Sequence, residues 1–142
     1  MAVLHAPSPA VPGGHLQYRH QLRRFGAVMG LAVPAIALAL GGLLLWWGDS
    51  AVRGSGGFLL TAMAAPTMLL LGVPVAGGTP RYIVAGVTSL ILWMAIGVWA
   101  SRRATHRVVA SWRDWWREYL WLAGPVWLGA TVAFVVAYKL VL

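Results

Sequence analysis

Four long apolar runs follow one another along the chain and alternate with short stretches that carry nearly all of its charged residues. The runs cover residues 25–47, 58–76, 81–100 and 119–141. Crossing a hydrocarbon core about 30 Å thick takes roughly 20 apolar residues, because an α-helix rises 1.5 Å per residue. The pattern therefore predicts an all-α integral membrane protein with four hydrophobic helices, which form a single domain over residues 25–142.

Prolines interrupt three of these runs, and the proline of the last run, Pro125, lies near its start. Pro34 lies inside the first run, where it predicts a kink near Gly30 to Pro34 and requires a neighbouring group that satisfies the carbonyl it leaves free. Pro66 and Pro74 make the second run the least regular of the four. That run is long enough to cross, so we expect four crossings. The alternative is three crossings with a re-entrant second segment, whose backbone must be hidden in protein.

Small residues recur at helical spacing in the first and last runs. Gly26 and Gly30 form a GxxxG pair, which allows two helices to pack closely. Gly129, Ala133 and Ala137 recur every four residues and form a smooth stripe along one side of the last helix. We expect both sets to pack against other helices.

Residues 101–118 form a basic, tryptophan-rich stretch between the third and fourth runs. By their spacing, the following aromatic residues share one face of a helix: Trp112, Trp115, Trp116 and Tyr119. Trp and Tyr favour the level of the lipid headgroups, because their rings are apolar but carry a polar N–H or O–H. We therefore expect this stretch at the membrane surface. The residues expected to bind anionic lipids or partner subunits there are Arg102, Arg103, Arg107, Trp112, Arg113, Trp115, Trp116 and Arg117.

Polar residues and turn formers predict where several elements begin and end. Ser111 and Asp114 have the spacing of a capping box, which predicts a helix beginning at Trp112. The sequence Gly-Gly-Thr-Pro at residues 77–80 predicts a tight turn and an antiparallel hairpin of the second and third helices. Residues 1–24 contain three prolines and two glycines, which predict a basic, largely disordered N-terminal tail.

The composition agrees with a membrane protein. Hydrophobic residues make up 60% of the 142 residues and charged residues 10%, whereas a soluble domain has roughly 25% charged residues. The net charge is +8, but the basic residues lie beside the apolar runs, where lipid headgroups and the rules of insertion account for them. We therefore expect no nucleic-acid partner. The absence of cysteine excludes disulfides, thiolate metal sites and cysteine nucleophiles.

The four runs have no Asp, Glu, His or Arg in their interiors, and such residues usually mark proton relays and ion-coupling sites. Of the four histidines, His5, His15 and His20 lie in the tail and His106 lies in the basic stretch, so none is at membrane depth to hold haem. Their spacing is not a recognisable metal pattern, and no serine has a nearby base and orienting acid. We expect no enzyme activity, no metal and no cofactor.

The distribution of basic residues bears on orientation. With four crossings, the tail and residues 101–118 lie on opposite sides of the membrane. A cytoplasmic tail then leaves five Lys and Arg residues inside and six outside, so the positive-inside rule gives no bias. With three crossings, both basic stretches lie in the cytoplasm.

These observations favour a non-catalytic accessory subunit of a larger bacterial inner-membrane complex, such as an energy-transducing one. It would dock to larger integral membrane subunits through its helix faces and the basic, Trp-rich stretch. Two alternatives remain. One is a small homo-oligomeric transporter or channel component with the second run lining a path, and the other is a membrane protein that binds anionic lipids.

Overall fold

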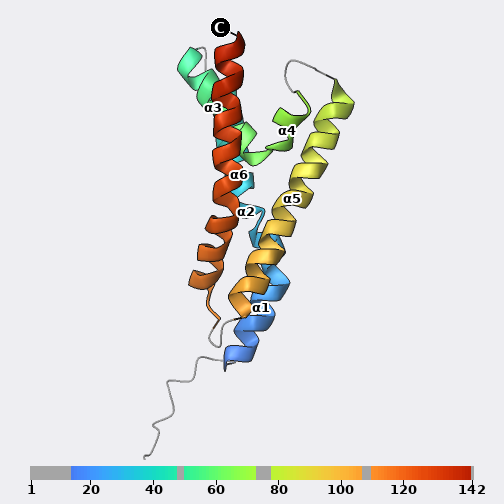
Figure 1. The fold of residues 1–142 in the computed structure, drawn as a ribbon, viewed down its shortest axis with the longest axis vertical. Helices are drawn as coiled ribbons and strands as arrows, with labels where there is room; N and C mark the ends of the chain where they lie inside the picture. The colour runs from blue at the N-terminus through green and yellow to red at the C-terminus, as the bar shows by residue number, and fades with distance from the viewer. Residues whose placement is uncertain (1–13, 48–49, 73–77, 107–109, 142) are drawn as a thin grey trace, which may run out of the picture.

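The computed structural model describes residues 14–47, 50–72, 78–106 and 110–141, and the side chains of residues 19–47, 50–72, 78–106 and 110–139. These residues form six α-helices and no strand (Figure 1): α1 (Gly14–Met29), α2 (Ala32–Trp46), α3 (Ala51–Ala64), α4 (Thr67–Leu70), α5 (Thr79–Thr105) and α6 (Trp112–Val141). The predicted all-α class is confirmed.

Three helical stretches of the described chain are long and apolar enough to cross a membrane. They are Arg19–Trp46, which combines α1 and α2, Thr79–Thr105 and Trp112–Lys139. Among the described residues, the second apolar run forms no helix of this length, because it is divided between α3 and α4. The protein is therefore a membrane protein with three candidate crossings, in place of the four expected from the sequence.

The three crossings alternate in direction (Figure 1). α1 packs antiparallel along α5, so that Gly26 lies against Ser101 and Gly30 lies against Trp93. α6 then returns alongside α5 and ends near the level at which α3 begins (Figure 1). As a result, α1, the end of α5 and the start of α6 meet at one end of the bundle, which we call the basic end because it carries most of the arginines.

The segment between α2 and α5 enters the bundle and returns to the side from which it came (Figure 1). α3 packs on α2 and ends at Ala64, whose carbonyl accepts a hydrogen bond of 2.6 Å from Trp93 in the middle of α5. The chain then turns back, because Thr67 at the start of α4 bonds to the carbonyl of Ala85, closer to the beginning of α5, at 2.8 Å. This is the re-entrant arrangement that the sequence offers as the alternative to four crossings.

Close approach of glycines holds the re-entrant segment against the first crossing. A side chain at Gly41 of α2 would lie 2.9 Å from the carbonyl oxygen of Gly57 in α3, and one at Gly57 would lie 2.9 Å from the carbonyl oxygen of Gly41. Only hydrogen atoms fit between the two backbones at this point. At Gly57 the backbone of α3 thus packs directly on that of α2, and a segment that enters the membrane without crossing it needs such packing against protein.

Two local predictions of helix ends are confirmed. α6 begins at Trp112. The Ser111 hydroxyl accepts from the N–H of Asp114 at 3.3 Å and donates to its carboxylate at 2.7 Å, in the manner of a capping box. α5 begins at Thr79 after Gly78, whose φ of +140° favours glycine. Of the predicted turn at residues 77–80, Gly77 lies outside the described residues.

The boundary of the N-terminal tail differs from the prediction. α1 begins at Gly14 rather than after residue 24, and its polar first half continues directly into the apolar run. The reason is packing: Leu22 lies among charged residues in the sequence but is fully buried in the core. Residues 1–13 lie outside the described part of the chain.

Candidate functional site

The core of the bundle is a cluster of three buried aromatic residues, Trp93 from α5 with Trp115 and Tyr119 from α6. The rings of Trp115 and Tyr119 are stacked, with centroids 5.0 Å apart and an interplanar angle of 15°. Trp93 lies 6.3 Å from Tyr119 and 5.9 Å from Trp127, centroid to centroid. The cluster fills the space where α1, α5 and α6 converge.

Each ring of this aromatic cluster carries one polar hydrogen, and each donates it to a buried oxygen. Tyr119 donates to the carbonyl of Gly30 at 2.9 Å, and Trp93 donates to the carbonyl of Ala64 at 2.6 Å. Trp115 donates to the hydroxyl of Ser101 at 3.0 Å. A buried donor or acceptor without a partner costs about 1–3 kcal/mol, so these bonds allow large polar aromatics to occupy the core.

Two of these bonds satisfy carbonyls at helix interruptions. Gly30 lies four residues before Pro34, which has no N–H to offer its carbonyl, and Tyr119 supplies the missing donor. The sequence predicted both the kink and the need for a neighbour, and both are confirmed by the ending of α1 at Met29, the start of α2 at Ala32 and the Tyr119 bond. Trp93 likewise donates a hydrogen bond to the carbonyl of Ala64, where α3 ends.

The aromatic face of residues 112–119 points into the bundle and not to the lipid headgroups. Trp115 and Tyr119 are fully buried, and Trp112 and Trp116 are half-buried against the same core. The spacing that puts the rings on one face is correct, but a shared apolar face fits a packing surface as well as a membrane surface. Trp115 therefore contacts the core of this chain and is not available to bind lipid or a partner.

The charged face of the same stretch is exposed to solvent and includes Arg113 and Arg117. Glu118 lies 3.8 Å from Arg103 of α5 and 3.8 Å from Arg117. Exposed ion pairs of this kind contribute about 0–1 kcal/mol, so they organise the charges more than they stabilise the fold. Arg107, which the sequence also assigns to this surface, lies outside the described residues.

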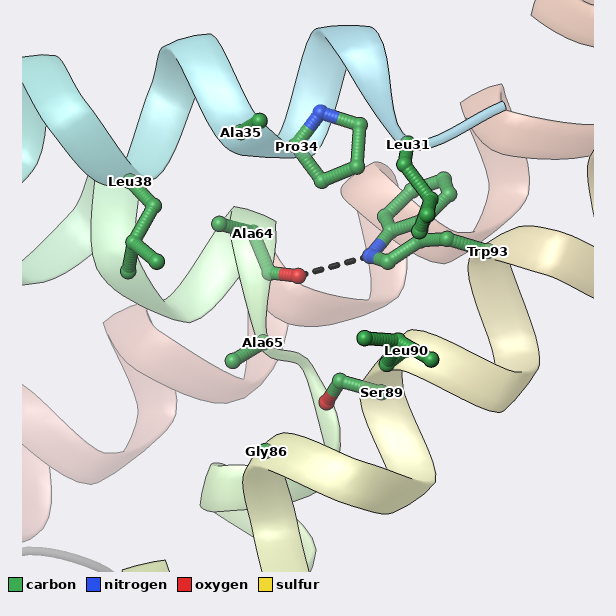
Figure 2. Close-up of a pocket in the computed structure, with 10 residues that line it drawn as sticks. All are labelled: Leu31, Pro34, Ala35, Leu38, Ala64, Ala65, Gly86, Ser89, Leu90 and Trp93. Atoms are coloured by element: carbon green, nitrogen blue, oxygen red, sulfur yellow. Dashed lines mark hydrogen bonds between the residues drawn. The ribbon is translucent and has the colours of Figure 1, made fainter. Parts of the chain in front are cut away.

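A cavity lies at mid-height, between α2, the end of α3 and α5 (Figure 2). It has a volume of about 280 Å³ and is lined by Leu31, Pro34, Ala35, Leu38, Ala64, Ala65, Gly86, Ser89, Leu90 and Trp93. The wall is almost entirely apolar. Its main polar groups are engaged: Trp93 donates to Ala64, and the Ser89 hydroxyl lies 2.6 Å from that of Thr67. The cavity suits a hydrocarbon segment and offers no charged group for an ion.

Sequence reasoning did not find this cavity, because it forms where two interrupted segments meet. One signal was present: Pro34 and Pro66 each break an apolar run, and broken helices at membrane depth often line a cavity. The sequence does not show that the two breaks lie at the same level. They do so because α3 ends at Ala64, whose carbonyl accepts a hydrogen bond from Trp93.

The two sets of small residues have different surroundings. A side chain at Gly30 would lie 2.7 Å from the carbonyl oxygen of Trp93, and one at Gly26 would overlap the hydroxyl of Ser101, so both glycines face α5 at close range. Gly129, by contrast, has nothing within 4 Å of the position of a side chain. Ala133 and Ala137 are exposed as well. The stripe on α6 points away from the rest of the described chain.

A second, polar pocket lies at the basic end between α1 and α5. It has a volume of about 440 Å³ and is lined by Arg23, Val98, Ser101, Arg102 and His106. Arg102 belongs to the set expected from the sequence. Arg23 and His106 do not, because the sequence alone did not bring α1 beside the end of α5.

No group of three or more His, Cys, Asp or Glu residues placed to hold a metal ion occurs within the part of the chain that the structure describes. Comparisons of the chain with models of protein families, with curated proteins and with solved structures found no match.

Proposed function

We propose that the protein is a small, non-catalytic subunit of a larger assembly in the bacterial inner membrane, and that it docks through the outward stripe of α6. The observation that carries this proposal is the exposure of Gly129, Ala133 and Ala137 along one side of that helix. Small residues let two helix backbones approach closely in lipid, where van der Waals packing drives helix association.

The chain itself provides a precedent for this use of small residues. Where Gly26 and Gly30 meet Gly97, α1 and α5 approach so closely that no side chain would fit. The stripe of α6 has the same periodicity, but none of the described helices packs against it. α6 is also the least covered crossing: 11% of its most apolar stretch is buried, compared with 33% for α5. A helix from a larger subunit would complete the packing.

The orientation follows from the position of the basic end. Seven arginines lie on α1, the last turns of α5 and the first turns of α6, whereas the opposite end has Arg53, Arg81 and Lys139. The basic set is Arg19, Arg23, Arg24, Arg102, Arg103, Arg113 and Arg117. The positive-inside rule then favours a cytoplasmic basic end. Four crossings would put the tail and residues 101–118 on opposite sides of the membrane, whereas three crossings put both on the cytoplasmic side.

The competing role as a transporter or channel component has less support. Broken helices in transporters use their freed carbonyls to coordinate ions. Here the carbonyls of Gly30 and Ala64 accept bonds from Tyr119 and Trp93. The adjoining cavity is apolar, so the described residues of the re-entrant segment line no polar path.

The test is purification of the full chain from its native membrane in mild detergent, with the stoichiometry of attached chains measured by native mass spectrometry. We expect one or more larger membrane proteins in fixed ratio. Ala133→Leu, which adds bulk to the stripe, should release them. The matched control is Ala95→Leu, because Ala95 is also exposed but lies on α5.

Three results would contradict the proposal. The first is a chain that purifies alone or only with copies of itself, and self-association with solute flux in liposomes would favour the transport role instead. The second is a partner that stays bound to the Ala133→Leu variant. The third is equal loss of the partner from both variants, which would place the contact elsewhere.

A further inference from the structure

The polar pocket at the basic end combines residues from two helices. Arg23 comes from α1, Val98, Ser101 and Arg102 come from the last turns of α5, and His106 is the cap that directly follows α5. Val98, Arg102 and His106 are four residues apart, so they form a line along one side of α5. Arg23 faces this line across the gap between the helices.

Among the residues that the structure describes, no carboxylate balances the charges of Arg23 and Arg102 in this pocket. Within the described residues, the ion pairs of Glu118 engage Arg103 and Arg117, whereas neither Arg23 nor Arg102 has a carboxylate within 4 Å. Arg102 lies in the last turn of α5, where the helix dipole favours a cation. Arg23 lies well inside α1, where the dipole provides no such reason. Both side chains are exposed, so water screens their mutual repulsion, and an anion between them would add a direct attraction to each guanidinium group.

The pocket also has a gradient of polarity along the helix axis. From Val98 to His106 the side of α5 rises about 12 Å and changes from aliphatic to cationic to aromatic and polar. A ligand that matches this order has hydrocarbon at one end and an anionic group about one to two helical turns away.

We propose that this pocket binds the phosphate group of an anionic phospholipid. Arg23 and Arg102 donate to the phosphate oxygens, a pairing for which the guanidinium geometry is well suited. His106 contacts the outer part of the headgroup, and an acyl chain lies along Val98. A zwitterionic lipid of the same length is disfavoured, because its ammonium group would lie beside the two arginines. The site is independent of the subunit role proposed above, which uses the opposite part of the molecule.

The test is native mass spectrometry of the full chain after reconstitution in nanodiscs of phosphatidylglycerol mixed with phosphatidylcholine. We expect the wild type to retain phosphatidylglycerol selectively after release. Arg23→Gln and Arg102→Gln should each weaken retention about tenfold, because hydrogen bonds between charged groups are among the strongest in proteins. The matched control is the pair Arg53→Gln and Arg81→Gln, which removes the same charge at the opposite end and should leave retention unchanged.

The outcomes separate the sources of the phosphate. Retention that is unaffected in the pocket variants, or that falls equally in the control, overturns the proposal. A parallel titration adds inorganic phosphate to the protein in the same mixed nanodiscs. Displacement of phosphatidylglycerol by millimolar phosphate, with phosphate bound in its place, would show that the pocket takes the free anion and would overturn its assignment to lipid.

Discussion

The two interrupted segments of this protein share their chemistry and differ in their path. Each has a proline at the start of the helix that follows the break, Pro34 in α2 and Pro66 before α4. Each also leaves a carbonyl that an aromatic side chain of another helix satisfies. The first segment nevertheless continues in the same direction and crosses, whereas the second turns back halfway (Figure 1).

The difference lies in the residues at the break. Leu31, between α1 and α2, keeps helical angles with φ −86° and ψ −15°, and backbone bonds from Gly30 to Gly26 and from Leu31 to Val28 carry the helix through the kink. Ala65, directly before Pro66, has φ −127° and ψ 69°, outside the helical region, as the ring of a following proline favours. A proline in a membrane helix therefore does not by itself decide the topology. The conformation of the residues at the break does.

The largest expected effect is in a test of the number of crossings, because a cysteine on one side of the membrane reacts almost completely or not at all with a reagent added to that side. The chain has no cysteine, so single-cysteine variants can be labelled with a membrane-impermeant maleimide. His20→Cys and Arg113→Cys should react from the same side of the membrane, and Ser50→Cys should react from the other side. All three residues are exposed. Reaction of the first two from opposite sides would restore the four-crossing arrangement and remove the basis of the comparison.

Next in size is the loss of the side chain that holds the second break. Trp93→Ala removes a buried ring and the donor to Ala64, so the free energy of unfolding in mixed micelles should fall by about 3–5 kcal/mol. Trp93→Phe keeps most of the ring and should cost about 1–3 kcal/mol for the unsatisfied carbonyl. Trp99→Phe is the control, because Trp99 is 60% exposed on the same helix. An equal effect of the two Phe variants would show that the Trp93 bond does not matter.

The first break allows a sharper test, because its missing donor can be restored. Tyr119→Phe should cost about 1 kcal/mol of unfolding free energy by leaving the Gly30 carbonyl buried without a partner. Pro34→Ala supplies a backbone N–H that can bond to the same carbonyl. In the double variant the cost of Tyr119→Phe should largely disappear, which gives a coupling of about 1 kcal/mol. Additive effects in the cycle would contradict the assignment, and Tyr138→Phe, at an exposed position, should change nothing.

The smallest effect concerns the return of the second segment. Thr67 donates to the carbonyl of Ala85 and lies 2.6 Å from the Ser89 hydroxyl, which ties α4 to α5. Thr67→Val should lower the free energy of unfolding by about 0.6 kcal/mol, the average for such bonds in membrane proteins. Thr131→Val is the control, because the Thr131 hydroxyl bonds only within its own helix. A larger loss from the control would mean that the α4–α5 bonds contribute little.

Local features of this fold could be predicted from the sequence where they depend on neighbouring residues. The capping pair Ser111 and Asp114, the turn before α5 and the kink at Pro34 all depend on residues within one or two turns of each other. Features that depend on distant residues could not be predicted. The donor for Gly30 comes from a residue 89 positions later, and the inward turn of Trp115 depends on where α5 places Ser101.

The number of crossings illustrates the same limit. Residues 58–76 have the length and hydrophobicity of a crossing, but these two criteria take no account of tertiary contacts. They do not register that Gly41 and Gly57 hold α3 against α2 or that Trp93 fixes the end of α3 at mid-height. The candidate site at the basic end was predicted in part, because Arg102 is in a visibly basic stretch, while Arg23 joins it through the packing of α1 along α5.

The bond between Tyr119 and Gly30 has a consequence for biogenesis. Ribosomes add ~5–20 residues per second, so the first crossing enters the membrane on the order of ten seconds before its partner tyrosine has been synthesised. During this interval the Gly30 carbonyl at the kink lacks the hydrogen bond that it accepts from Tyr119 in the complete fold. The first crossing therefore enters the membrane about 1 kcal/mol less stable than it is in the complete bundle, and it gains this bond only when the C-terminal crossing arrives.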